Sequence, residues 1–372
     1  MNAKSDCAAA YAPGPSPLAV RVDSSVKALF GPAVEAAARA AAQGLGVATG
    51  TLTVEDNGAL DYVVAARVEA ALRAAGVAAP ARHRSAAPAP APLRERRRRS
   101  RLYLPGNQPD LFPNAGLFLA DCLILDLEDS VAPSRKEDAR ILVRRVLEQH
   151  RGFFGEAEII VRINPLSGPY GALDLVELSG CLPHAVILPK CESAADVAAL
   201  DRALGEDTGA TLIMPLVETA RGVLAAAAIA AASPRVAALC FGAEDYMADV
   251  GARRSAAGTE TLYARQAIVV AAKAAGVQAL DSVFSDTEDL PAFASWCEAS
   301  RAMGFDGVGV IHPRQVGAAN AAYSPSPEEI EEARAVIAAM QEAEAGGSGV
   351  ASLHGRMIDA PVARRARRIV GE

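Results

Sequence analysis

Eight short apolar runs, separated by alanine-rich segments of helical length, constrain the fold of this chain more than any other feature. They span residues 102–104, 122–127, 159–163, 185–188, 212–217, 236–241, 277–283 and 307–311. Apolar runs of this length, without polar alternation, are typical of strands that are buried on both faces of a parallel sheet. Eight such strands alternating with helices predict an α/β fold, a (β/α)8 TIM barrel.

A doubly wound open sheet is the alternative to the barrel. Such a sheet usually has fewer strands, and it carries a G-x-G-x-x-G turn directly after its first strand. Here Pro105, Gly106 and Asn107 follow the first run, and Gly307 and Gly309 fall inside the last one. Neither segment fits that fingerprint, so the barrel is the favoured prediction.

The composition of the chain changes sharply at an Ala-, Pro- and Arg-rich segment, 76–98, which predicts a semi-rigid linker. Before it, residues 1–75 predict a small α+β domain. After it, residues 99–325 contain the eight runs. Residues 326–372 begin with a helical pattern, pass through Gly346-Gly-Ser-Gly349 and end in a short arm, which predicts a C-terminal lid.

The small domain shows two alternating strand patterns at 18–23 and 51–55, and two helical patterns at 26–34 and 60–72. It carries no catalytic cluster of its own.

Charge and hydropathy exclude several classes of protein. The net charge of −7 argues against nucleic-acid binding by the chain as a whole. The longest Ala-rich run, 223–232, is too short to span a bilayer, and the first residues lack the apolar region of a signal peptide. The six cysteines are scattered without a C-x-x-C pair, which is typical of reduced thiols. We therefore expect a cytoplasmic protein without membrane or nucleic-acid partners.

Two carboxylates follow successive apolar runs. Glu218 comes directly after 212–217, and Asp245 comes shortly after 236–241. The carboxyl ends of barrel strands meet at the face where such barrels do chemistry, so the two acids are expected to share one divalent cation. Mg²⁺ prefers one or two carboxylates with water and substrate oxygens, whereas the absence of a nearby His or Cys cluster argues against Zn²⁺.

Further charged residues end neighbouring runs, and they indicate an anionic substrate. Arg162 offers a planar fork for a substrate carboxylate, which suggests a 2-oxo or 2-hydroxy acid chelated to the metal. Lys190 is a candidate for a Schiff base, but its acidic surroundings favour an ion pair. The arginine run 96–99 has two interpretations, a solvated linker end or a contact for the phosphates of a thioester carrier.

Several motifs in order make residues 97–370 resemble the citrate lyase beta subunit, within the wider family of citrate lyases, malyl-CoA lyases and related aldolases. The motifs are RSRLYLPG at 99–106, LDLEDS at 125–130, VRIN at 161–164, LPK at 188–190, LVET at 216–219, FGAED at 241–245, IHP at 311–313 and MID at 357–359.

The resemblance implies roles for individual residues. Glu218 and Asp245 are expected to bind Mg²⁺, Glu218 and Arg162 to contact the oxo acid, and Arg99 to contribute to substrate binding. Asp359 matches an aspartate that family members insert from a lid as acid or base, often from the next subunit of a trimer or hexamer.

Two more acids at the end of the second strand, Asp126 and Glu128, are expected to support the metal-binding residues without binding the ion themselves.

Residues 1–75 resemble the acyl carrier (gamma) subunit of citrate lyase, through short matches such as ARVEAAL at 66–72. The resemblance implies that Ser5 carries a phosphoribosyl-dephospho-CoA arm. The alternative is an unmodified domain with a purely structural role.

The leading functional hypothesis is an Mg²⁺-dependent lyase that cleaves a citryl thioester to an acetyl thioester and oxaloacetate, with an alpha-type transferase subunit as a further partner. The alternative is a malyl-CoA or citramalyl-CoA type lyase with a vestigial carrier domain. A non-catalytic assembly protein is the rival from another class, and the joint presence of Arg162, Glu218, Asp245 and Asp359 argues against it.

Overall fold

The computed structural model describes residues 4–78, 94–205, 211–255 and 258–371. It divides into two compact units, Met1–Ala319 and Asn320–Glu372. Most of the predicted linker, residues 79–93, lies outside the described residues. Within the described ranges, no helix has the length and apolar character needed to cross a membrane.

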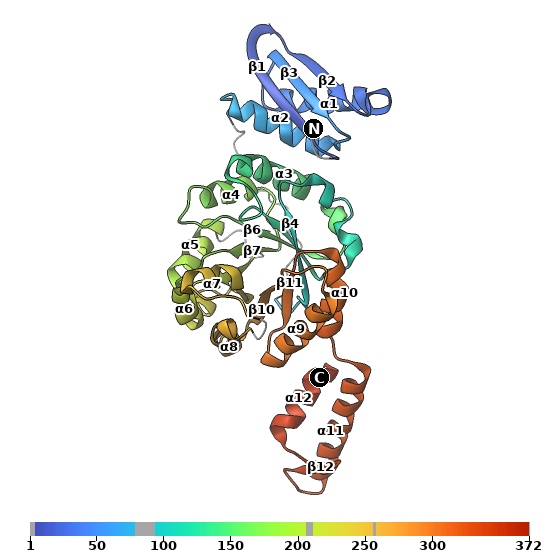
Figure 1. Cartoon of the computed structure of the whole chain (residues 1–372), viewed down its shortest axis with the longest axis vertical. Helices are drawn as coiled ribbons and strands as arrows, with labels where there is room; N and C mark the ends of the chain where they lie inside the picture. The colour runs from blue at the N-terminus through green and yellow to red at the C-terminus, as the bar shows by residue number, and fades with distance from the viewer. Residues whose placement is uncertain (1–3, 79–93, 206–210, 256–257, 372) are drawn as a thin grey trace. The chain divides into compact units, whose positions relative to one another are not determined.

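A closed barrel of parallel strands forms the centre of the first unit, and helices surround it (Figure 1). Its strands close in the order β10-β11-β4-β5-β6-β7-β8-β9. They are β4 (Ser100–Pro105), β5 (Cys122–Asp126), β6 (Glu158–Arg162), β7 (Ala185–Leu188), β8 (Leu212–Val217), β9 (Ala238–Phe241), β10 (Gln278–Val283) and β11 (Gly307–Val310). The predicted (β/α)8 barrel is therefore confirmed, with each apolar run forming one strand.

The helices that follow the strands cover the outside of the barrel. They are α3 (Lys136–Gln149), α4 (Gly171–Leu178), α5 (Ala194–Leu204), α6 (Ala220–Ala230), α7 (Ala243–Val250), α8 (Thr259–Ala274), α9 (Leu290–Met303) and α10 (Pro313–Ala322). Inside the barrel, Ile124, Ile160, Ile187 and Met214 belong to one fully buried cluster. The interior below the mouth is thus filled by side chains, as in other barrels of this type.

The register of β8 and β9 positions the site. Val217 pairs with Phe241, so the residues that follow them, Glu218 and Gly242, emerge side by side at the carboxyl ends of the two strands. The polar residues that directly follow the paired strand ends therefore lie at the mouth of the barrel, where barrels of this type have their active sites.

The N-terminal domain is an α+β unit with the sheet order β1-β3-β2. Its elements are β1 (Cys7–Pro17), β2 (Ala19–Ser24), α1 (Lys27–Gly44), β3 (Thr49–Asp56) and α2 (Asp61–Ala74). Strand β1 was not predicted from the sequence. It is an edge strand built from Ala, Pro and Gly, and prolines are tolerated at a sheet edge although they carry no strand signal.

A buried ion-pair network joins helix α2 of this domain to α3 and α4 of the barrel. The carboxylate of Glu69 on α2 forms ion pairs with Arg144 at 2.5 Å and with Arg145 at 2.6 Å, both on α3. Arg73 on α2 pairs with Glu177 of α4 at 3.0 Å. Because Glu69, Arg144 and Glu177 are buried, each charge depends on its partner across the contact. The N-terminal domain is therefore docked on its own barrel.

The second unit packs α11 (Pro327–Ala345), a hairpin of β12 (Ala351–Leu353) and β13 (Arg356–Ile358), and α12 (Ala360–Val370). Its core includes Val336, Ile337 and Met340 of α11 with Ile358 and Ala363. The division between the units falls inside α10, a few residues before the predicted domain end at 325.

Candidate active site

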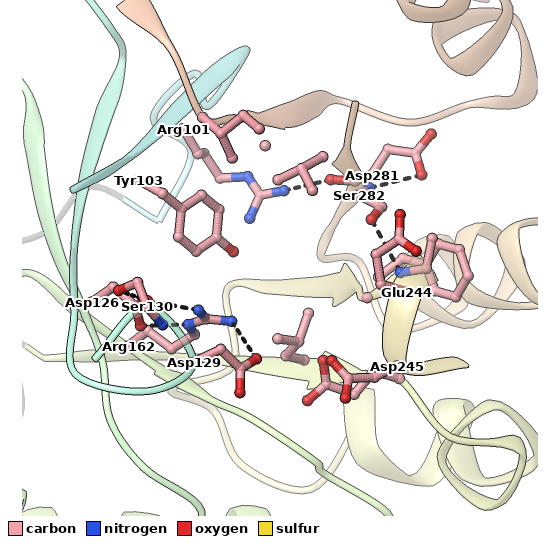
Figure 2. A pocket seen from close by; sticks show the side chains of 18 of the residues that line it. Arg101, Tyr103, Asp126, Asp129, Ser130, Arg162, Glu244, Asp245, Asp281 and Ser282 are labelled. Atoms are coloured by element: carbon pink, nitrogen blue, oxygen red, sulfur yellow. Dashed lines mark hydrogen bonds and ion pairs between the residues drawn. The ribbon is translucent and has the colours of Figure 1, made fainter. Parts of the chain in front are cut away.

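A cavity of about 470 Å³ opens at the carboxyl ends of the barrel strands. Figure 2 shows how charged side chains from opposite walls point into it. Its polar lining residues are Arg101, Tyr103, Asp126, Asp129, Ser130, Arg162, Glu218, Glu244, Asp245, Asp281 and Ser282. A cavity of this size holds a small acid together with the end of a longer substrate.

Glu218 is the most deeply placed acid of the candidate metal pair. It follows β8, is 2% exposed, and its Oε1 accepts the backbone N–H of Lys190 at 2.7 Å. Burial raises the pKa of Glu218 to about 8, and the nearby Asp245 carboxylate acts in the same direction. A Cβ at Gly242 would collide with Oε2 and Cβ of Glu218, so the close approach of the two strand ends requires glycine there.

Asp245 lies in the first turn of α7 rather than at a strand end, and 41% of its side chain is exposed. A helix N-terminus favours a negative charge, which stabilises this carboxylate at the mouth. After burial, the Asp245 carboxylate is the next largest cause that raises the pKa of Glu218, so the two predicted metal ligands lie close enough to interact.

Lys190 bridges acids from two sides of the site. Its Nζ lies 3.1 Å from Oε1 of Glu128 and 3.3 Å from Oδ1 of Asp245. Although burial by itself lowers it, the carboxylates of Glu128 and Glu218 raise the pKa of Lys190. A positively charged amine is no nucleophile, so the geometry agrees with the ion-pair role expected for Lys190.

Lys190 also has a backbone φ of 50°, in the left-handed region that non-glycine residues rarely adopt. This conformation turns its backbone N–H toward Glu218.

Arg162, at the end of β6, is held by Asp126 of β5 in a bidentate pair, with Nε to Oδ1 at 2.6 Å and Nη2 to Oδ2 at 2.7 Å. Its guanidinium stacks over the ring of Tyr103, 5.1 Å from the centroid. The fork predicted for a substrate carboxylate is thus already occupied by Asp126. The remaining terminal nitrogen of the guanidinium, Nη1, lies 3.0 Å from Glu128 and 3.6 Å from the exposed Asp129.

The pKa values of Asp126 and Glu128, the two acids predicted to support the metal site, are shifted in opposite directions. Although burial opposes it, Arg162 holds the pKa of Asp126 below its usual range. Burial raises the pKa of Glu128 to about 7, with Asp129 acting in the same direction against Arg162. Asp126 therefore anchors Arg162 as a fixed anion, whereas Glu128 is poised to change its charge near neutral pH.

Three predicted site residues of the first unit, Arg99, Glu128 and Ser5, are not among the residues that line the cavity. Arg99 precedes β4 and pairs with Asp121, Nη2 to Oδ1 at 2.8 Å, which commits its guanidinium at the amino end of the strand. Arg101 of the same motif lines the cavity, whereas the role of Arg99 in substrate binding stays a prediction.

Ser5 belongs to the N-terminal domain, where its N–H donates to Asn57 O at 2.9 Å. Asp359 belongs to the second unit, where its carboxylate caps α12 by accepting the N–H of Val362 at 3.1 Å. Their roles stay predictions.

The sequence analysis missed Arg101 and Tyr103 as site residues. Both point inward from β4, and the signal that could have found them is the alternation of Arg101, Tyr103 and Pro105 with Leu102 and Leu104. In a barrel strand, alternate residues face the interior, so a charged residue at such a position is a candidate for the site.

Glu218 and Asp245 fit a magnesium ion. One carboxylate is buried and fixed by a backbone N–H, and the other is open to the cavity. Burial and the neighbouring Asp245 raise the pKa of Glu218, and a bound cation would offset both by favouring the ionised carboxylate. Across the described ranges, no group of three or more His, Cys, Asp and Glu side chains could hold a metal ion. Magnesium needs only one or two carboxylates, because water and substrate oxygens complete its shell.

Comparison with protein families supports both parts of the chain. The family model described as HpcH/HpaI aldolase/citrate lyase matches residues 99–313. A second model, described as malonate decarboxylase delta subunit, an acyl carrier family, matches residues 2–75.

Individual relatives agree with the first match. Citrate lyase subunit beta of Haemophilus influenzae is 38% identical over 73% of this chain and 95% of its own length. The human mitochondrial citramalyl-CoA lyase is 36% identical over 72% of this chain and 83% of its own length. The crystal structure of Mycobacterium tuberculosis CitE with magnesium, acetoacetate and coenzyme A is 35% identical, covers 75% of this chain and all of that chain, and superposes with a TM-score of 0.64.

The raised pKa of Glu218 predicts a pH dependence of stability in the absence of divalent cations. The pKa moves from 4.5 to about 8 on folding, so between pH 5 and 8 the folded protein keeps a proton that the unfolded chain has lost. Stability therefore falls as pH rises through this range. We expect the free energy of unfolding of the wild type to fall, relative to Glu218→Gln, by on the order of 3 kcal/mol.

Denaturant unfolding of both proteins at pH 5, 6.5 and 8, with a chelator present, measures this difference. Glu288→Gln, at an exposed surface glutamate, is the matched control and should follow the wild type. A difference between wild type and Glu218→Gln that stays flat across the range would show that Glu218 is ionised in the folded protein.

Proposed function

The chain belongs to the HpcH/HpaI aldolase/citrate lyase family, and on that premise we propose that this lyase depends on Mg²⁺ and cleaves a citryl thioester to an acetyl thioester and oxaloacetate. The observation that carries the proposal is the pairing of Glu218 with Asp245 at the mouth of the barrel, in one cavity with Arg162. Two neighbouring carboxyl groups beside a buried arginine suit a cation that is shared with an anionic substrate.

Glu218 and Asp245 would hold the ion, which when bound supplies Lewis-acid polarisation of the substrate hydroxyl and carboxylate oxygens. The ammonium of Lys190 lies between the carboxylates of Asp245 and Glu128, so it offsets the negative charge of both. Arg162 would contact the oxo-acid part of the substrate through Nη1, in place of its long contact to Asp129. Asp126 keeps that guanidinium in one orientation.

We assign proton transfer to Asp359, from the lid of the same or a neighbouring subunit in a homo-oligomer. Its carboxylate takes the proton of the tertiary hydroxyl. The bond between the hydroxyl-bearing carbon and the methylene next to the thioester carbonyl then breaks. The hydroxyl carbon becomes the 2-oxo carbon of oxaloacetate, and the electron pair passes to the thioester enolate, which takes up a proton to give the acetyl thioester.

The N-terminal domain would deliver the thioester on a phosphoribosyl-dephospho-CoA arm at Ser5, after loading by an alpha-type subunit. Next to Ser5, the buried Asp6 pairs with Arg67 at 2.9 Å, and Arg67 donates to Asn107 O at 3.1 Å. Asn107 lies in the loop that follows β4, on the face of the barrel that carries the cavity. The docked position of this domain supports delivery to its own barrel.

Lyase activity against a panel of thioesters tests the proposal. Citryl-CoA should be cleaved with Mg²⁺ and not with a chelator, and Glu218→Gln should lower kcat/KM at least about 100-fold, because it removes a charged ligand of the ion. Glu288→Gln is again the control.

Faster cleavage of malyl-CoA or citramalyl-CoA than of citryl-CoA would favour the alternative substrates. Unchanged cleavage by Glu218→Gln would overturn the catalytic assignment.

Intact mass of the protein purified from its own host tests the carrier role. We expect added mass equal to one phosphoribosyl-dephospho-CoA group, lost in Ser5→Ala and kept in Ser25→Ala, a serine whose hydroxyl contacts Asn57 in the same domain. A protein of unmodified mass that is active on free CoA esters would mean that the domain is only structural.

A further inference from the structure

Arg101 is a buried cation at the cavity, and it has no carboxylate partner among the residues that the structure describes. It is 1% exposed, and its guanidinium lines the cavity from β4. Its Nη2 donates to the backbone oxygen of Asp281 at 2.7 Å, and Nη1 lies 3.5 Å from Sγ of Cys240. Its Nε has no hydrogen-bond partner in the described part of the chain.

The Asp281 carboxylate does not neutralise Arg101, because it is committed elsewhere. It pairs with Arg265, accepts the hydroxyl of Ser300, and accepts the N–H of Ser282 at 2.9 Å. Only the backbone oxygen of Asp281 is left to Arg101.

Other buried arginines of the same barrel are paired differently. Arg98 grips Glu158 through Nε at 2.6 Å and Nη2 at 2.7 Å, and Arg162 grips Asp126 in the same way. Arg265 pairs with Asp281. Burying a guanidinium without a counter-charge is costly, so Arg101 is the exception that calls for a negative ligand.

The position of Arg101 indicates which ligand. Figure 2 shows Arg101 and Arg162 on the two sides of the Tyr103 ring, both turned toward the interior of the cavity. Two separate cations in one small cavity fit a substrate with two separate carboxylates. Each terminal nitrogen of a guanidinium carries two N–H groups, so Arg101 has donors to spare beside its unpaired Nε.

We propose that Arg101 binds the second carboxylate of a dicarboxylic 2-oxo acid and thereby selects it over a monocarboxylic one. This inference rests on the proposed function, since it takes the oxo-acid end to lie at Glu218, Asp245 and Arg162. The buried arginine would be neutralised only when a dicarboxylate is bound. A monocarboxylate would leave it unpaired, which is the kind of penalty that gives strong discrimination.

Calorimetric binding of oxaloacetate and of pyruvate to the full chain, with Mg²⁺ and without any thioester, tests the inference. The wild type should prefer oxaloacetate. Arg101→Met should weaken oxaloacetate binding about 100-fold, the usual cost of removing one partner of a buried charge pair, and change pyruvate binding less than about 3-fold. Arg101→Lys keeps the charge and loses the forked guanidinium, so its affinity for oxaloacetate should lie between those of the wild type and Arg101→Met.

Thermal unfolding separates binding from folding. Without ligand, Arg101→Met should melt at or above the temperature of the wild type, because it removes an unpaired buried charge. Oxaloacetate should raise the melting temperature of the wild type and leave that of Arg101→Met unchanged.

If Arg101→Met weakened the binding of oxaloacetate and pyruvate equally, the inference would be overturned, because Arg101 would then contact a group that both acids have. Unchanged discrimination in Arg101→Met, or a wild type that binds neither acid, would overturn it as well. A wild type that discriminates through Arg101 but cleaves no thioester would instead refute the proposed function and leave the inference standing.

Discussion

The close approach of two carboxyl groups, the buried Glu218 and Asp245, is the constraint on which the rest of the site depends. The paired ends of β8 and β9 force a buried glutamate against Gly242, and α7 then brings Asp245 beside it. Burial and Asp245 raise the pKa of Glu218, and the ammonium of Lys190 offsets part of the negative charge. A rigid barrel keeps these groups together where a flexible loop would let them separate. In the unliganded protein a proton on Glu218 therefore limits the negative charge at the site, and a bound cation would replace that proton.

Around this pair, fixed ion pairs hold the cavity walls in place. Asp126 at the end of β5 holds Arg162, and Asp281 within β10 holds Arg265. The network of Glu69, Arg144 and Arg145 similarly fixes the N-terminal domain on α3. Since breaking any of these pairs leaves a buried charge alone, the charged framework is costly to rearrange. Arg101 stands out against it because its charge has no such partner among the described residues.

Much of the fold could be predicted from the sequence, because buried parallel strands are continuous apolar runs. Each of the eight runs became a strand, and Glu218 and Asp245 came together as their positions implied. Strand β1 could not be found, since an Ala- and Pro-rich edge strand lacks an apolar alternation. Arg101 was not predicted as a site residue, although the motif contains it, because only the alternation along β4 shows which of its residues face inward. The occupied fork of Arg162 depends on Asp126 in a neighbouring strand, a pairing that is set by register and not by sequence spacing.

Calorimetric titration of Mg²⁺ into the wild type, Glu218→Gln, Asp245→Asn and the double variant tests the shared site most directly. We predict one ion per chain for the wild type, loss of most of the affinity in each single variant, and little further loss in the double variant, because both side chains would serve one ion. Wild-type affinity in either single variant, or losses that simply add in the double variant, would contradict a site that is shared by Glu218 and Asp245.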